Sequence, residues 1–69
     1  MSSEVFKLTE IVGTSTESTE AAIRAALARA KESIRGIRWF EVTGTRGAIL
    51  ADGTIEFQVE LKLGFAVED

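Results

Sequence analysis

Residues 54–67, TIEFQVELKLGFAV, alternate between apolar and polar side chains almost without interruption. The odd-numbered positions are apolar: Ile55, Phe57, Val59, Leu61, Leu63, Phe65 and Val67. Most even-numbered positions are polar: Thr54, Glu56, Gln58, Glu60 and Lys62. Successive side chains of a strand point to opposite faces, so this pattern predicts one long β-strand with one buried face. At ~3.3 Å per residue the apolar face is about 45 Å long.

Asp52-Gly53, directly before this strand, is a strong signal for a β-hairpin. Residues 38–50 are therefore predicted to form the partner strand. A two-residue turn gives the following opposed pairs: Ile49–Glu56, Val42–Leu63 and Phe40–Phe65. In this register Phe40 and Val42 join the apolar core face, and Gln58 lies opposite Gly47, because directly opposed side chains share a face.

The N-terminal part predicts a strand over residues 4–12, ended by Gly13, and then a helix that runs to about Arg35. Thr14 and Glu17 have the spacing of a capping box, and Ser18 is an alternative helix cap. Apolar residues at helical spacing predict the buried stripe of the helix: Ile23, Leu27, Ala30, Ile34 and Ile37. The many alanines favour helix and allow a neighbouring element to approach closely. Gly36 is the expected left-handed stop.

The element order is strand, helix, strand, strand, so we predict an α+β fold in which a three-stranded antiparallel sheet wraps around one helix. Residues 1–69 are expected to form a single domain. A helix of about 18 residues is only about 27 Å long and cannot cover the apolar face of the last strand. With 69 residues and no Cys, the chain is also expected to be only marginally stable without a partner subunit. We therefore expect a homo-oligomer.

Composition excludes several classes of protein. The formal net charge of −3 argues against nucleic acid and anionic membrane surfaces as partners. The N-terminus, MSSEVFKLTE, lacks the pattern of a signal peptide, which favours the cytoplasm. With no His and no Cys, the chain lacks the usual metal ligands, and no bound metal is predicted.

Trp39, the one Trp in the chain, is predicted to project from the polar side of the sheet, away from the helix. Three interpretations remain open: contact with a partner subunit, a stacking platform for a flat ligand, or a slipped register that turns the indole inward. Gln58 shares that side, and its amide is either solvated or paired with the polar edge of a ring. Strict alternation points Arg46 toward the core, but a bulge among its neighbouring glycines would turn it outward. There it would meet a phosphate or a local carboxylate.

At these residues the chain resembles the dodecin family. The matching segments are EIVGTS (10–15), WFEVT (39–43), Arg46-Gly47 and FQVELKLGF (57–65). The resemblance implies a hollow homo-dodecamer that stores and protects riboflavin or FMN without catalysis. It implies that Trp39 stacks on the flavin ring and that Gln58 hydrogen-bonds the polar edge of the ring. Paired flavins would lie between tryptophans, with Arg46 as a candidate phosphate ligand.

Two positions depart from the family pattern. Bacterial members commonly carry Arg where this chain has Ala66, and a basic residue where it has Ala48. Both changes weaken a phosphate site, since Arg46 alone contributes only about 1–3 kcal/mol as a charged hydrogen bond. We therefore expect riboflavin to compete well with FMN, and coenzyme A, which some members bind, is left open.

The predicted register separates Trp39 from Gln58 by eight residues along the strand, or about 26 Å. One tricyclic ring cannot touch both, so a shared flavin requires two subunits. Other classes stay open beside storage. A flavoenzyme needs an acid or base near the ring, and Glu41 is the one nearby candidate. A structural oligomer uses the same fold without a ligand, and a calcium-binding member would be expected to lack the Trp.

Overall fold

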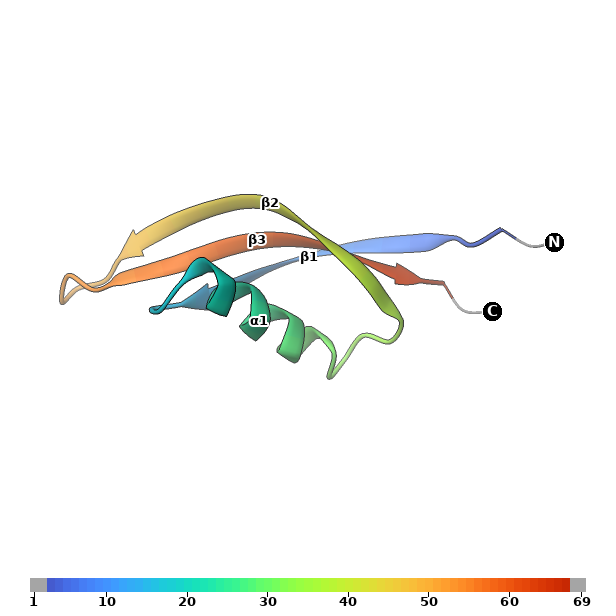
Figure 1. Cartoon of the computed structure of the whole chain (residues 1–69), viewed down its shortest axis with the longest axis horizontal. Helices are drawn as coiled ribbons and strands as arrows, with labels where there is room; N and C mark the ends of the chain where they lie inside the picture. The colour runs from blue at the N-terminus through green and yellow to red at the C-terminus, as the bar shows by residue number, and fades with distance from the viewer. Residues whose placement is uncertain (1–2, 68–69) are drawn as a thin grey trace.

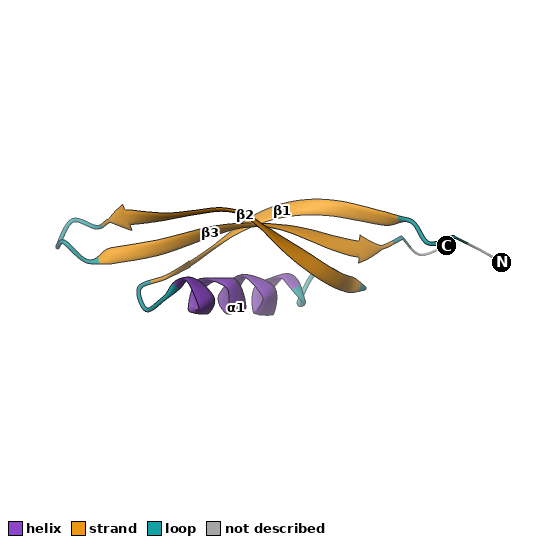
Figure 2. Ribbon diagram, turned by 45° about the horizontal axis from the view of Figure 1, so that its top comes forward, coloured by secondary structure: helices purple, strands orange, loops and turns teal. Residues whose placement is uncertain are grey.

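The computed structural model describes residues 3–67 and has four elements in the predicted order. They are β1 (Phe6–Ser15), α1 (Thr19–Ala30), β2 (Ile37–Ile49) and β3 (Ile55–Ala66). The three strands form one antiparallel sheet in the order β1-β3-β2. The strand with the most regular alternation, β3, is thus central, and α1 lies along one face of the sheet (Figures 1 and 2). The predicted fold class is confirmed; the strand and helix boundaries differ by one to five residues.

β1 does not end at Gly13 as predicted but continues to Ser15. Gly13 is buried where the helix crosses the strand, and a Cβ at this position would overlap with the carbonyl oxygen of Ala22. It would also lie 2.8 Å from the Cβ of Ala26. Gly13 therefore allows close contact between β1 and α1, rather than ending the strand.

The helix begins at Thr19 and is capped by Ser18, whose Oγ accepts a hydrogen bond from the backbone N–H of Ala21 at 3.0 Å. The predicted capping box of Thr14 and Glu17 is not formed, because Thr14 still belongs to β1. The α-helix ends at Ala30 rather than at Arg35. Gly36 has the expected positive φ of 74°, but it lies beyond the helix, in the turn that leads into β2.

The most buried side of α1 consists of alanines: Ala22, Ala26 and Ala30. The predicted stripe was correct in Ala30 but wrong in placing the larger residues at its centre. Ile23, Leu27, Ile34 and Ile37 are only partly buried beside it. Small side chains face the sheet because α1 packs so closely at Gly13, and this displaces the bulky residues to the flank of the helix.

The hairpin register differs from the prediction in three places: at the turn, between Val42 and Gly44, and between Ile37 and Trp39. Ile49 opposes Ile55, and the N–H of Leu50 donates to the carbonyl of Thr54 at 2.8 Å, which leaves three turn residues rather than two. Gly53 takes φ of 89° there, as a three-residue turn requires. A bulge between Val42 and Gly44 adds a second shift of one residue.

The shift at the turn reverses the predicted faces, and the bulge between Val42 and Gly44 restores them. Together they displace the pairing by two residues, so Phe40 opposes Leu63 and Val42 opposes Leu61 rather than the predicted partners. Both side chains still lie on the helix side of the sheet, because a shift of two preserves the face. Between the bulge and the turn, only one shift applies, and the face of each β2 residue is reversed from the strict alternation.

The core of this chain is small. The buried side chains are Ala22, Ala26, Ala30, Val59, Leu61 and Leu63. The chain is 56 Å long and exposes 5134 Å², whereas a compact protein of 7.5 kDa would expose about 4,200 Å².

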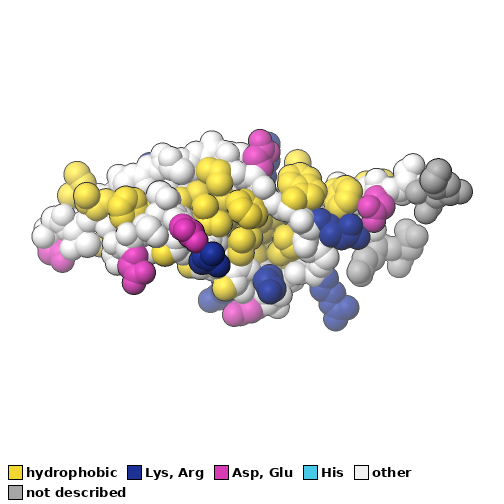
Figure 3. Space-filling view, viewed as in Figure 1, with side chains coloured by type: hydrophobic (Ala, Val, Ile, Leu, Met, Phe, Trp, Pro, Cys, Tyr) yellow, Lys and Arg dark blue, Asp and Glu magenta, His cyan; other side chains and the backbone are white. Residues whose placement is uncertain are grey.

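Large apolar side chains remain exposed along β2 and the hairpin, among them Phe40, Val42 and Ile49 at 82%. Figure 3 shows apolar side chains gathered along the middle of one side of the molecule. The helix therefore leaves part of the apolar sheet uncovered, as its length predicted.

Candidate functional site

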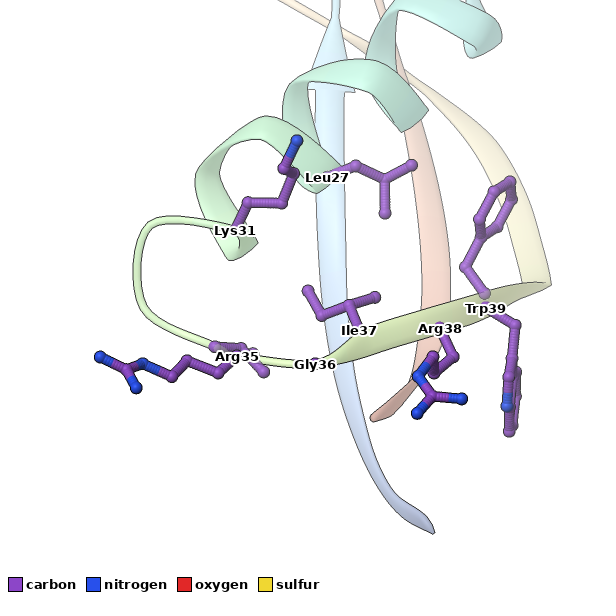
Figure 4. A pocket seen from close by; sticks show the side chains of 9 residues that line it. Leu27, Lys31, Arg35, Gly36, Ile37, Arg38 and Trp39 are labelled. Carbon is purple, nitrogen blue, oxygen red and sulfur yellow. The ribbon is translucent and has the colours of Figure 1, made fainter. Parts of the chain in front are cut away.

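Trp39 lies on the face of the sheet that α1 does not cover. It opposes Gly64 of β3. Leu61 and Leu63 are buried against the helix, and because side chains alternate along a strand, position 64 belongs to the opposite face. We call the side opposite the helix the outer face. The indole is 42% exposed and projects from β2 away from the helix (Figure 4). The predicted orientation is confirmed: the register is shifted by two residues here, but the indole does not turn inward.

Gly64 and Phe6 fix the position of this indole. A Cβ on Gly64 would overlap with Cε2 and Cζ2 of Trp39, so the ring occupies the space that any other residue would fill. The ring of Phe6, from β1, meets the indole edge-on with centroids 6.4 Å apart and planes at 60°. The guanidinium of Arg38 lies over the ring of Phe6, with its Cζ 5.8 Å from the ring centroid. The indole is thus supported from one side and exposed on the other.

Gln58 and Arg46 lie together on the same outer face. The bulge between Val42 and Gly44 turns Arg46 outward, as predicted, and sets it opposite Gln58. The prediction that Gln58 opposes Gly47 was wrong, because the longer turn shifts the register; Gly47 opposes Phe57.

Four polar side chains form one network of hydrogen bonds and an ion pair here: Arg46, Glu56, Gln58 and Glu60. Arg46 Nη1 donates to Oε1 of Gln58 at 3.3 Å, and Gln58 Nε2 donates to Oε1 of Glu56 at 3.1 Å. Arg46 Nη2 forms an ion pair with Oε2 of Glu60. Of the two open interpretations of Arg46, the local carboxylate is thus the partner in the protomer.

Trp39 and Gln58 are far apart within one protomer. Gly64, the neighbour of Trp39, lies six residues from Gln58 along β3, or about 20 Å at ~3.3 Å per residue. This is shorter than the predicted 26 Å, since the true register brings Trp39 closer to the turn. It still exceeds the reach of one three-ring ligand. A single protomer therefore does not present both groups to one such ligand.

A hollow of about 550 Å³ opens beside Trp39, between the C-terminal end of α1 and the start of β2 (Figure 4). Leu27 and Ile37 supply part of its apolar lining, and Lys31, Arg35 and Arg38 are cationic residues at its wall. In Figure 4 the indole points away from the helix that forms the other wall. Trp39 is itself among the residues that line this hollow, so the hollow adjoins the exposed indole.

Sequence analysis missed four residues of this arrangement: Phe6, Glu56, Glu60 and Gly64. Parity along β3 already placed Glu56, Glu60 and Gly64 on the polar side with Gln58. The order of the strands was needed to bring Phe6 from β1 to the same face. The pairing of Arg46 with Glu60 required the exact position of the bulge.

The model of the family described as Dodecin matches residues 5–68 of this chain. The chain belongs to the dodecin family. A curated dodecin from Thermus thermophilus is 52% identical over 66 residues, which are 96% of each protein. The crystal structure of an arginine-to-alanine mutant of the T. thermophilus dodecin has a TM-score of 0.89. It is 52% identical and covers 97% of this dodecin and 98% of that chain.

A calcium-chelating calcium dodecin from Mycobacterium tuberculosis is also similar, with a TM-score of 0.84 and 33% identity. The match covers 93% of this dodecin and 91% of that chain, and that protein has a calcium-binding site. Within residues 3–67 of the present dodecin, no three His, Cys, Asp or Glu side chains gather as metal ligands. In the same range, α1 is neither long nor apolar enough to cross a membrane.

Proposed function

We propose that this dodecin binds riboflavin or FMN without converting it, and that twelve copies form a cytoplasmic shell that stores flavin and limits its photochemistry. The observation that carries the proposal is the indole of Trp39. One side of it is supported by Gly64 and Phe6, and the other side is exposed on the outer face. An aromatic side chain held in this way offers a large surface for stacking at low entropic cost.

Assembly is supported by the apolar surface that the protomer leaves open. The described residues expose large side chains on both faces of the sheet, including Leu8, Val12, Phe40 and Val42. Exposed apolar patches of this kind mark sites of protein–protein contact. Burying them between copies would also bring the outer face of one protomer against another, so that the exposed sides of two indoles can enclose flat ligands.

Two features of the chain support storage rather than catalysis. A ring stacked on Trp39 and covered by a neighbouring copy is closed to a second substrate. The sequence contains no His, Cys or Tyr, and Glu41, two residues from Trp39, is an exposed strand carboxylate. Turnover of reduced nicotinamide by the purified protein would favour a flavoenzyme instead.

Titration of riboflavin against the purified protein tests this function. We expect the fluorescence of riboflavin to be quenched at saturation in wild type. Trp39→Ala should weaken binding about ten- to hundredfold, since stacking on an aromatic side chain contributes roughly 1–3 kcal/mol. Trp39→Phe, the matched control, should keep part of the affinity. A colourless wild-type oligomer that does not bind added riboflavin would support the alternative of a structural oligomer. An oligomer that binds calcium instead of riboflavin would support a calcium-binding function.

A further inference from the structure

Glu60 and Arg46 form an ion pair on the outer face, beside the proposed flavin ligand Gln58. We propose that Glu60 determines which flavin this protein prefers, by competing with the phosphate of FMN for Arg46 and so favouring phosphate-free riboflavin. This inference rests on the proposed function and names the ligand class more narrowly.

Both terminal nitrogens of Arg46 are already engaged within the protomer. Nη2 pairs with Oε2 of Glu60, and Nη1 donates to Oε1 of Gln58 at 3.3 Å. These contacts use two of the five N–H donors of the guanidinium, so a phosphate that approaches it competes with a carboxylate that lies on the adjacent strand. Since charged hydrogen bonds are stronger than neutral ones, this competition selectively weakens the binding of the phosphorylated ligand.

The local charge acts in the same direction. Glu56 and Glu60 are both on the outer face of β3, on either side of Gln58, and Glu56 accepts from the amide of Gln58 at 3.1 Å. Two carboxylates thus accompany one guanidinium. A phosphate dianion placed beside Gln58 is repelled by this net negative charge, whereas the uncharged end of riboflavin is not.

Glu60 does not hinder recognition of an uncharged ring. Its contact is with Arg46, and the orientation of the Gln58 amide is set by the donor on Arg46 and the acceptor on Glu56. The pair is partly exposed, with side-chain exposures of 45% for Arg46 and 41% for Glu60, so solvent screens it. The expected effect is accordingly modest and confined to the phosphorylated ligand.

The test compares dissociation constants for riboflavin and FMN in the assembled protein, measured by fluorescence quenching at low salt. In Glu60→Gln, which keeps the shape of the side chain, affinity for FMN should rise by up to about fivefold relative to riboflavin. Glu32→Gln makes the same change in net charge at an exposed position near the end of α1 and should leave the ratio unchanged. Adding Arg46→Ala to Glu60→Gln should remove the gain.

The outcomes are separable. If Glu60→Gln still binds riboflavin but the FMN-to-riboflavin ratio does not change, the role of Glu60 is overturned and flavin storage stands. An equal rise in Glu32→Gln would attribute the effect to net charge and would also overturn it. If wild type binds no riboflavin at all, the proposed function fails and this inference fails with it. Riboflavin affinity in each variant reports that the site is still folded.

Discussion

The indole of Trp39 occupies the space that a side chain at position 64 would fill, and Gly64 leaves that space empty. The two residues oppose each other across β2 and β3. The backbone of Gly64 is not left-handed, so the glycine is needed for room rather than for conformation. The position of the indole proposed to stack on flavin therefore depends on the absence of a side chain at Gly64.

Gly64→Ala should displace the indole. The added Cβ overlaps with two ring atoms, and overpacking of this kind costs about 1–3 kcal/mol of stability. We expect a shift in Trp fluorescence, a lower melting temperature and weaker riboflavin binding. Gly47→Ala is the control, since its Cβ would lie 3.5 Å from Cγ2 of Ile55, an ordinary contact. Equal riboflavin affinity in Gly64→Ala and wild type would contradict the positioning role.

Gly13→Ala should separate the helix from β1. Here the obstacle is the backbone of Ala22, which cannot rotate away as a flexible side chain can. We expect a loss of roughly 2–3 kcal/mol in the free energy of unfolding, measured with urea. Gly44→Ala, whose Cβ would lie 3.5 Å from Oε1 of Glu60, should cost much less. Similar losses in both variants would argue against close packing at Gly13.

The hairpin turn predicts a dependence of stability on pH. The N–H of Thr54 donates to Oδ1 of Asp52 at 2.9 Å, and this bond lowers the pKa of Asp52 from its ordinary value of 3.8. A carboxyl with a lowered pKa in the folded state adds stability above the unfolded value, and that contribution is lost as the pH falls through the folded pKa.

Asp52→Asn should therefore be less stable than wild type at pH 7, and the difference should shrink well below pH 3.8. Asp52 is fully exposed, so the difference will be small. Thermal unfolding of both proteins at pH 7 and at strongly acidic pH measures it. A difference that stays constant over this range would show that the carboxylate charge is not involved.

A flavin site shared between protomers predicts complementation. Since about 20 Å separates Trp39 from Gln58 in one chain, Trp39→Ala and Gln58→Ala each damage every site when assembled alone. In shells formed from a mixture, some sites combine the intact Trp39 of one copy with the intact Gln58 of another. We expect a tight-binding fraction of riboflavin to return after reassembly. Its absence from verified mixed shells would count against a shared site.

The sequence by itself determined the element order and the faces of the sheet. Alternation over residues 54–67 fixed which side of β3 meets the helix, and the outward position of Trp39 followed from parity. The length of the apolar strand against one helix also predicted surface left open for a partner. These features are encoded locally, in the period of the side chains and in the turn at Asp52 and Gly53.

Only the tertiary structure decided the details of the site. A turn one residue longer and a bulge at Val42 and Gly44 change no composition and no hydrophobic pattern, yet they place Arg46 opposite Gln58 and beside Glu60. The central place of β3 brings Phe6 from β1 to the indole of Trp39. Such contacts depend on register and strand order, which arise from packing across the whole sheet and not from any single segment.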